Sequence, residues 1–129
     1  MKSPYVQRLK DVGYDDIGHV GGKSASLGEM LRGLSSAGVR VPDGFSTTVD
    51  AYRCFIKEND LEERIGSILR QYQGKQLKLR QAGKGIRDLI LKNAFPEEVA
   101  TAIRIAYRHL CAHYEEDSLP VAVDRKSVV

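Results

Sequence analysis

The sequence contains no tryptophan, only two cysteines, and no apolar run that approaches the roughly 20 residues a membrane-spanning helix requires. Its start, MKSPYVQRLKD, also lacks the apolar stretch of a signal peptide. We therefore expect a cytoplasmic protein that does not cross a membrane. Cys54 and Cys111 lie far apart in helix-like segments, and in a cytoplasmic protein we expect buried thiols rather than a disulfide.

Neither sign of charge dominates the chain. Lys and Arg together number 20 and Asp and Glu 17, which leaves a net charge of +3. This bias is too weak to indicate nucleic-acid binding, although a mixed surface can still bind phosphate groups locally. With 129 residues, 42% apolar and 29% charged, the composition predicts one soluble, globular domain with a modest core.

The hydrophobic pattern predicts short strands with about five helices between them, so the expected fold class is α/β or α+β. Strands are expected at 5–9, around Phe45 after a Pro-Asp-Gly turn, and at 119–123. The expected helices run from Gly22 to Gly38, from Thr48 onward, within 58–72, over 79–90 and over 95–114.

Local signals mark the ends of these helices. Gly38 is expected to end the first helix, and Thr48 is a suitable N-cap for the second. Asp60 followed by Glu63 is the pattern of a capping box for the third helix. Pro96 suits the first turn of the last helix, which has the clearest amphipathic spacing.

The segment HVGGKSASLGEM, residues 19–30, places a Gly-Gly-Lys-Ser run at the start of a predicted helix. It is not a Walker-type phosphate loop, because that motif needs a glycine six positions before its lysine and Ile17 stands there. Gly21 and Gly22 nevertheless let the backbone approach a ligand closely, and a helix N-terminus suits an anion. Lys23 adds a positive charge of the kind that binds phosphates. From these residues alone, phosphate binding and an ordinary glycine turn both remain open.

Other candidate sites are weaker. His109 and His113 are four residues apart, but no third metal ligand is evident beyond Glu116 or Asp117, which favours ordinary surface histidines. No Ser-His-Asp or Cys-His arrangement has a supporting motif. The loop at 19–30 is therefore the leading functional candidate.

Two segments taken together, VGGKSASLGEM and AGVRVPDGFSTTVDAYRCF, resemble the opening of the phosphoenolpyruvate synthase family, which is grouped with pyruvate phosphate dikinase and the rifampicin phosphotransferases. AGKGIRDLI and PEEVATAIRIAY are similar to later helices of that family, so the resemblance covers about residues 5–123. The serine after Lys23 and the Leu-Gly-Glu-Met run favour the synthase over its relatives. The matching residues are Gly21, Gly22, Lys23, Ala25, Leu27, Gly28, Glu29, Met30, Gly38, Val41, Pro42, Gly44, Phe45, Thr47, Thr48, Ala51 and Tyr52.

The resemblance implies that this chain is the N-terminal portion of an ATP-grasp-type nucleotide-binding domain. It implies that Lys23 reaches the phosphates of ATP, while Gly21 and Gly22 shape the loop around them. A direct ligand role for Thr47 or Thr48 stays open, although N-capping explains Thr48 adequately.

In this family, ATP phosphorylates a histidine on a separate swivelling domain with the help of Mg²⁺, and a barrel domain passes the phosphoryl group to pyruvate. The resemblance thus implies the conversion of ATP, pyruvate and water to AMP, phosphoenolpyruvate and phosphate. None of the three histidines here resembles the swivelling one, so we expect no catalytic residue in this chain, weak Mg-ATP binding and no hydrolysis. Two alternatives stay open: a part of a rifampicin phosphotransferase or pyruvate phosphate dikinase, or a non-catalytic nucleotide-binding module.

The chain departs from the family after residue 123. The family continues with Arg-Ser-Ser-Ala, whose arginine also binds phosphate, whereas Asp124 stands here and would repel an anion. The last six residues, DRKSVV, are what the start of a common sequencing adapter encodes in one reading frame. We therefore expect residues 1–123 to be a partial nucleotide-binding domain and residues 124–129 to be a non-native tail, with a divergent native tail as the alternative.

Overall fold

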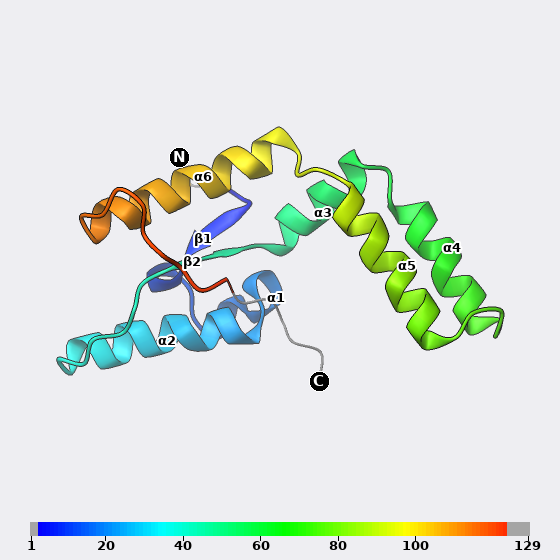
Figure 1. Ribbon diagram of the computed structural model, residues 1–129. Helices are drawn as coiled ribbons and strands as arrows, with labels where there is room; N and C mark the ends of the chain where they lie inside the picture. Colours follow the sequence, from blue (N-terminus) through cyan, green and yellow to red (C-terminus); the bar gives the residue numbers. More distant parts are fainter. Residues whose placement is uncertain (1–2, 124–129) are drawn as a thin grey trace.

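The computed structural model describes residues 3–123, which form helices around one small sheet (Figure 1). The two-stranded sheet lies in the middle, with α6 on one side of it and α1 and α2 on the other. Helix α3 leads from the sheet to α4 and α5, which form a hairpin that projects away from this body. The combination of helices and short strands confirms the fold class predicted from the sequence.

The sheet joins two segments that are distant in the sequence. Strands β1 (Val6–Arg8) and β2 (Phe45–Thr47) pair antiparallel, with Gln7 opposite Ser46. The strand predicted at 5–9 is therefore confirmed, although it has only three residues. Its pairing with β2 brings the N-terminal segment next to the chain that enters α3.

The polar segment after β1 folds into compact helical turns. Two 3₁₀ helices span Leu9–Asp11 and Tyr14–Asp16, and α1 (Ile17–Val20) adds a single α-helical turn. Val12, between the two 3₁₀ helices, is among the most deeply buried side chains. These turns bring the chain round to the start of α2.

Helix α2 (Gly22–Ser36) ends at the predicted glycine. Gly38 has a φ of +82°, in the left-handed region that glycine favours. Its N–H donates to the Ser35 carbonyl (3.1 Å), and the Val39 N–H donates to the Leu34 carbonyl (2.9 Å). These two bonds form a Schellman motif, so the stop signal at Gly38 is confirmed.

Helix α3 (Val49–Glu58) begins after the predicted N-cap. The Thr48 hydroxyl oxygen accepts a hydrogen bond from the Ala51 N–H (3.3 Å), and the same hydroxyl donates to the Pro4 carbonyl (2.6 Å). Thr48 is only 4% exposed, so both bonds are sheltered from water. The cap therefore also ties α3 to the chain just before β1.

Helix α4 (Glu62–Gln73) does not begin with the predicted capping box. Asp60 has a φ of +53°, and its N–H donates to the Lys57 carbonyl (3.1 Å), so it ends α3 instead of capping α4. The N-cap of α4 is Leu61, which is fully buried. The prediction for Asp60 and Glu63 is wrong because burying Leu61 requires the tight reversal that Asp60 makes.

Helix α5 (Leu79–Lys92) packs alongside α4 in the projecting hairpin. Gly85 of α5 faces Ile68 of α4, and a Cβ on Gly85 would lie 3.2 Å from the Ile68 Cδ1 atom. The glycine thus allows a close approach of the two helices. The helix predicted over 79–90 is confirmed.

Helix α6 (Glu97–His113) is the longest in the described chain and begins after Pro96. Along one side it buries Val99, Ala102 and Leu110. These positions are separated by three and eight residues, which keeps them on the face that meets the body. The strongest helix signal in the sequence is therefore confirmed.

The segment 119–123, for which the residue pattern predicts a strand, has no regular secondary structure. The Leu119 carbonyl accepts a hydrogen bond from the Tyr107 hydroxyl (2.7 Å), and Val123 is 89% exposed. A strand exists only by pairing its backbone groups with a neighbour, and within residues 3–123 no strand pairs with this segment. The strand prediction is therefore wrong for the described chain, and the predicted tail at 124–129 lies outside the described residues.

Candidate functional site

Gly21 joins α1 to α2 by a turn that other residues avoid. Its N–H donates to the Ile17 carbonyl (2.8 Å) and closes α1, while its carbonyl accepts the first hydrogen bond of α2 from Ala25 (3.1 Å). Its φ of +86° and ψ of 162° lie in a region that is essentially restricted to glycine. The structure therefore explains why a glycine stands at this point of the loop.

Gly22 and Lys23 form the exposed first turn of α2. Amide groups in the first turn of a helix point past its end and carry the positive end of the helix dipole. The first turn of α2, which lies wholly within the described chain, carries no acidic residue. Lys23 adds its own positive charge to this end, so the local field favours an anion.

Ser24 ties the first turn of α2 to the sheet. Its hydroxyl donates to the Ser46 Oγ (2.9 Å), and the Ser46 hydroxyl donates in turn to the Thr47 carbonyl (2.9 Å). The next residue of α2, Ala25, is fully buried. These contacts hold the N-terminus of α2 against β2, so the glycine turn is supported by the core.

A weaker contact joins the loop to α3. The His19 Nδ1 atom lies 4.0 Å from the Asp50 carboxylate, and both side chains are more than a third exposed. An exposed pair of this kind adds little to stability, because water screens the charges. The pair lies where α1 contacts the first turn of α3.

A second cluster on α2 holds the turns that precede α1. The Glu29 carboxylate accepts hydrogen bonds from the Tyr14 N–H (3.1 Å) and the Arg32 guanidinium (3.0 Å). Arg32 also donates to the Val12 carbonyl (3.0 Å). The sequence pattern does not predict this supporting role of Glu29, whose only signal is its place in the Leu-Gly-Glu-Met run.

The two threonines considered as ligands differ in position. Thr48 is buried, and its hydroxyl is engaged by the cap and by the Pro4 carbonyl. Thr47 is exposed at the end of β2, and its carbonyl accepts the Ser46 hydroxyl. The capping role of Thr48 is therefore the one that the geometry supports.

The remaining candidate residues do not assemble into a site. His109 and His113 are exposed on α6, and residues 3–123 contain no group of three or more His, Cys, Asp or Glu side chains that could hold a metal ion. Cys54 and Cys111 are free thiols, the first half-buried and the second buried. Among the residues the structure describes, no helix combines the length and apolar character that a membrane span requires.

A glycine turn at the N-terminus of a 15-residue helix, with a lysine on its first turn, suits the phosphates of a nucleotide. The chain belongs to the family described as the pyruvate phosphate dikinase AMP/ATP-binding domain, whose profile matches residues 17–128. The match includes the whole loop at 19–30.

Within this family the chain is similar to phosphoenolpyruvate synthases. It is 40% identical to the phosphoenolpyruvate synthase of Neisseria meningitidis serogroup B over 124 residues, which is 95% of this chain and 16% of that protein. It is 41% identical to the enzyme of Escherichia coli K12 over 120 residues, covering 92% of this chain and 15% of that protein. A probable phosphoenolpyruvate synthase of Methanocaldococcus jannaschii is also 41% identical over 120 residues, 92% of this chain and 10% of its own length.

These similarities confirm the resemblance predicted from the loop and the segment after it. The chain spans 10–16% of the length of these three relatives, so it corresponds to a small part of each of them.

Proposed function

We propose that this chain is the N-terminal part of the ATP-binding domain of a phosphoenolpyruvate synthase, in which Gly21, Gly22 and Lys23 bind the phosphates of ATP. The observation that carries the proposal is the glycine-only turn at Gly21, which leads directly into an exposed helix N-terminus bearing Lys23. Membership in a family described as AMP/ATP-binding supports the same ligand.

The reaction proposed for the complete protein converts ATP, pyruvate and water to AMP, phosphoenolpyruvate and phosphate. Phosphoryl transfer depends mainly on positioning and charge neutralisation, and the loop supplies both for the phosphates. The swivelling phosphohistidine domain, the barrel domain and the rest of an ATP-grasp-type fold are proposed to lie in other parts of that protein. His19, His109 and His113 are given no catalytic role.

Mg²⁺ is proposed for the complete protein, but the described residues do not form a site for it. Within 3–123 no cluster of carboxylates and histidines has the composition of a metal site. We therefore assign none of these residues to the ion. We also propose a cytoplasmic location, in keeping with the free thiols of Cys54 and Cys111.

The 129-residue chain by itself is expected to bind Mg-ATP weakly and not to hydrolyse it. Gly21, Gly22 and Lys23 are all exposed, so a bound phosphate would remain in contact with water. Water weakens each electrostatic contact. Tight binding by this chain that is lost in Lys23→Ala would contradict the view that more of the domain is required.

The test begins with the genomic reading frame across the codon for Val123, read in long sequencing reads. We propose that the frame continues there with Arg-Ser-Ser-Ala, and that residues 124–129 are a non-native tail. The complete protein would then be assayed for AMP formation with and without pyruvate. Formation that depends on another acceptor, such as a rifamycin, would indicate a related phosphotransferase, and a genuine stop after Val129 would contradict the enzyme proposal for this chain.

The loop itself is tested with Lys23→Ala in the complete protein. Loss of a hydrogen bond to a charged group is worth about 1.5–3 kcal/mol, so kcat/KM for ATP should fall by about 10- to 150-fold. Lys57→Ala, an exposed lysine near the C-terminal end of α3, is the matched control and should leave kcat/KM unchanged. Equal effects of the two substitutions would contradict the assignment of Lys23.

A further inference from the structure

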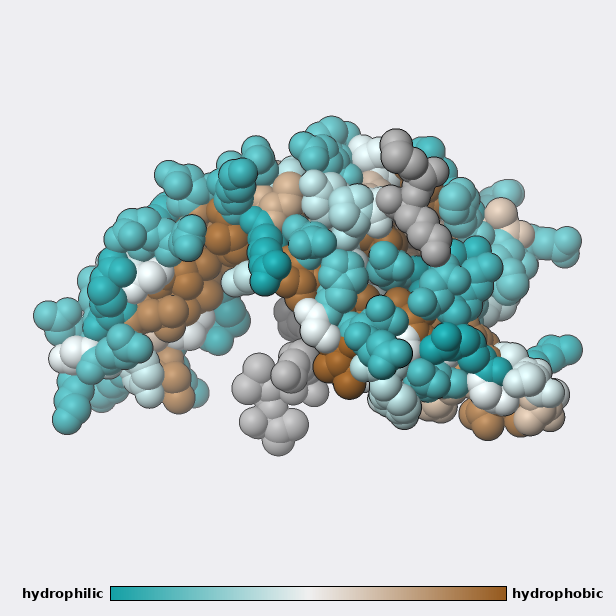
Figure 2. Space-filling model, turned by 180° about the vertical axis from the view of Figure 1, so that it is seen from behind, coloured by the Kyte–Doolittle hydropathy of each residue, from teal (hydrophilic) through white to brown (hydrophobic). Residues whose placement is uncertain are grey.

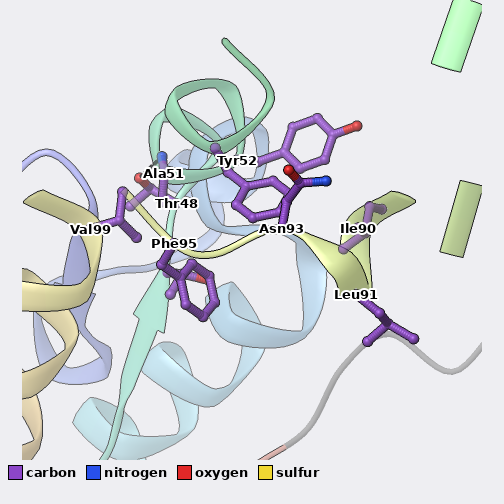
Figure 3. A pocket seen from close by; sticks show the side chains of 10 residues that line it. Thr48, Ala51, Tyr52, Ile90, Leu91, Asn93, Phe95 and Val99 are labelled. Atoms are coloured by element: carbon purple, nitrogen blue, oxygen red, sulfur yellow. Dashed lines mark hydrogen bonds between the residues drawn. The ribbon is translucent and has the colours of Figure 1, made fainter. Parts of the chain in front are cut away.

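An apolar pocket lies between α3, the end of α5 and the start of α6 (Figure 3). Its volume is about 460 Å³, and its described lining comes from 47–55 and 90–99, not from the loop at 19–30. The pocket is therefore separate from the proposed phosphate site. The large apolar side chains that line it are Tyr52, Phe55, Ile90, Leu91, Phe95 and Val99.

Two of the polar side chains that line the pocket, Thr48 and Asn93, are engaged inside the chain. Thr48 bonds to the Pro4 carbonyl and to the first turn of α3, and the Asn93 side-chain amide donates to the Leu89 carbonyl (2.6 Å). The residues that line the pocket within the described chain include no charged side chain. A nucleotide or other charged ligand would lose hydration here without gaining an oppositely charged partner, whereas an apolar side chain has no charge to desolvate.

The rim of the pocket exposes large apolar side chains to water. Leu91 is 77% exposed, Phe95 60% and Tyr52 57%, although Phe95 also packs edge-to-face on Phe55 with ring centres 5.9 Å apart. Figure 2 shows hydrophobic surface that extends from the α4–α5 hairpin, at the left in that view, into the middle of the molecule. Contiguous exposed apolar surface of this kind marks an interaction site.

We propose that this pocket and its rim pack against a later segment of the same polypeptide, which inserts an aliphatic or aromatic side chain between Tyr52, Leu91 and Phe95. The inference rests on the proposed function, under which the chain is part of a longer protein. The aligned region covers 92–95% of this chain but only 10–16% of the length of each relative. Most of each relative therefore lies outside the aligned region.

The course of the described chain favours the same occupant. After α6 the chain turns back from the far end of that helix and crosses the body toward α1, as Figure 1 shows. The side chain of the last described residue, Val123, is 89% exposed and so does not pack onto the body. A continuation from that point starts on the body of the molecule, not at its periphery.

The test measures thiol accessibility in the complete protein encoded by the reading frame that contains this chain. Leu91→Cys and Arg80→Cys are made separately, labelled with N-ethylmaleimide, and followed by peptide mass spectrometry so that native cysteines do not interfere. Arg80 lies eleven residues earlier on the same face of α5, about 16 Å along the helix and near the tip of the hairpin. It is the matched control for reactivity on this helix.

Each labelling rate is compared with the rate of the same variant unfolded in urea. We expect Leu91→Cys to react at least about 100-fold more slowly in the folded protein, and Arg80→Cys less than about tenfold more slowly. Fast labelling at position 91 would overturn the proposal. Protection that disappears on dilution would also overturn it, because the occupant would then be a second copy of the protein.

The two proposals fail in distinguishable ways. A protein that forms AMP in a pyruvate-dependent reaction but leaves position 91 reactive refutes only the packing proposal. A protein that protects position 91 but lacks this activity refutes only the proposed function. A reading frame that ends after Val129 overturns both.

Discussion

Gly28 of α2 lies directly against the main chain at Leu9: a Cβ on Gly28 would be 2.6 Å from the Leu9 carbonyl oxygen. The carbonyl oxygen of Val12 would be closer still. Because both obstacles are backbone atoms, neither can move aside as a flexible side chain would. The glycine therefore sets how closely α2, which begins with the phosphate-binding candidate, packs on the turns before it.

Gly28→Ala is expected to lower the free energy of unfolding. Overpacking costs about 1–3 kcal/mol, which outweighs the gain of up to about 1 kcal/mol from the better helix propensity of alanine. Gly33→Ala is the control on the same helix, since no atom lies within 4 Å of its Cβ position. Urea denaturation should show Gly33→Ala as stable as the parent or up to about 1 kcal/mol more stable. If Gly28→Ala behaved in the same way, the close backbone contact would be disproved.

Gly21→Ala should be destabilising, while Gly22→Ala should not. Gly21 has φ +86° and ψ 162°, which costs a residue with a side chain about 1–3 kcal/mol. Gly22 is the first residue of α2, where alanine is accommodated and no atom lies within 4 Å of its Cβ position. Urea denaturation should show a loss of stability only for Gly21→Ala, and calorimetric titration of the complete protein with Mg-ATP measures the affinity of each variant. Loss of affinity in both variants without a stability difference would count against the strained turn.

Asp60→Gly is expected to stabilise the protein. Asp60 has a φ of +53°, and glycine relieves the strain of this left-handed conformation by about 0.5–1 kcal/mol. The capping-box interpretation predicts the opposite sign, because glycine would remove a side-chain cap from α4. The shift of the urea midpoint decides between the two, and Asp60→Ala, which keeps the strain and removes the carboxylate, separates conformation from charge.

Tyr5 should ionise at unusually high pH. Hydrogen bonds to the Cys54 side chain and to the Glu98 carboxylate raise the pKa of the Tyr5 hydroxyl from 10.0 to about 12. Because folding raises this pKa, the protonated hydroxyl stabilises the fold fully below pH 10, and that contribution is lost as pH rises toward 12. The ultraviolet difference titration between the parent protein and Tyr5→Phe should therefore show one phenol titrating near pH 12. A difference signal centred near pH 10 would show that these contacts do not form in solution.

Local signals in the sequence predicted much of the fold correctly. The stop at Gly38, the cap at Thr48 and the long helix after Pro96 depend on interactions within a few residues, so they can be identified without knowing the rest of the structure. The loop at Gly21 to Lys23 is also predicted from local features, because two glycines followed by a lysine at the start of a helix indicate a possible anion-binding turn. Its role in binding ATP stays a prediction.

The errors arose where a local signal had to be weighed against packing. Asp60 and Glu63 have the spacing of a capping box, but burial of Leu61 places the chain reversal at Asp60. The segment 119–123 has the apolar character of a strand, but no strand pairs with it in the described chain. In both cases the structure depends on tertiary contacts, which the local residue pattern does not contain: the burial of Leu61 in the first case and the lack of a pairing strand in the second.

The sequence by itself determined the helices, the cap at Thr48, the stop at Gly38, the glycine loop and the family, because each of these depends on residue types at short, ordered spacing. Only the tertiary structure decided that Gly28 is required by the backbone at Leu9, that Ser24 is anchored on Ser46, and that an apolar pocket opens beside Phe95. Those features join segments that lie far apart along the chain, and their energies depend on distances that exist only once the chain has folded.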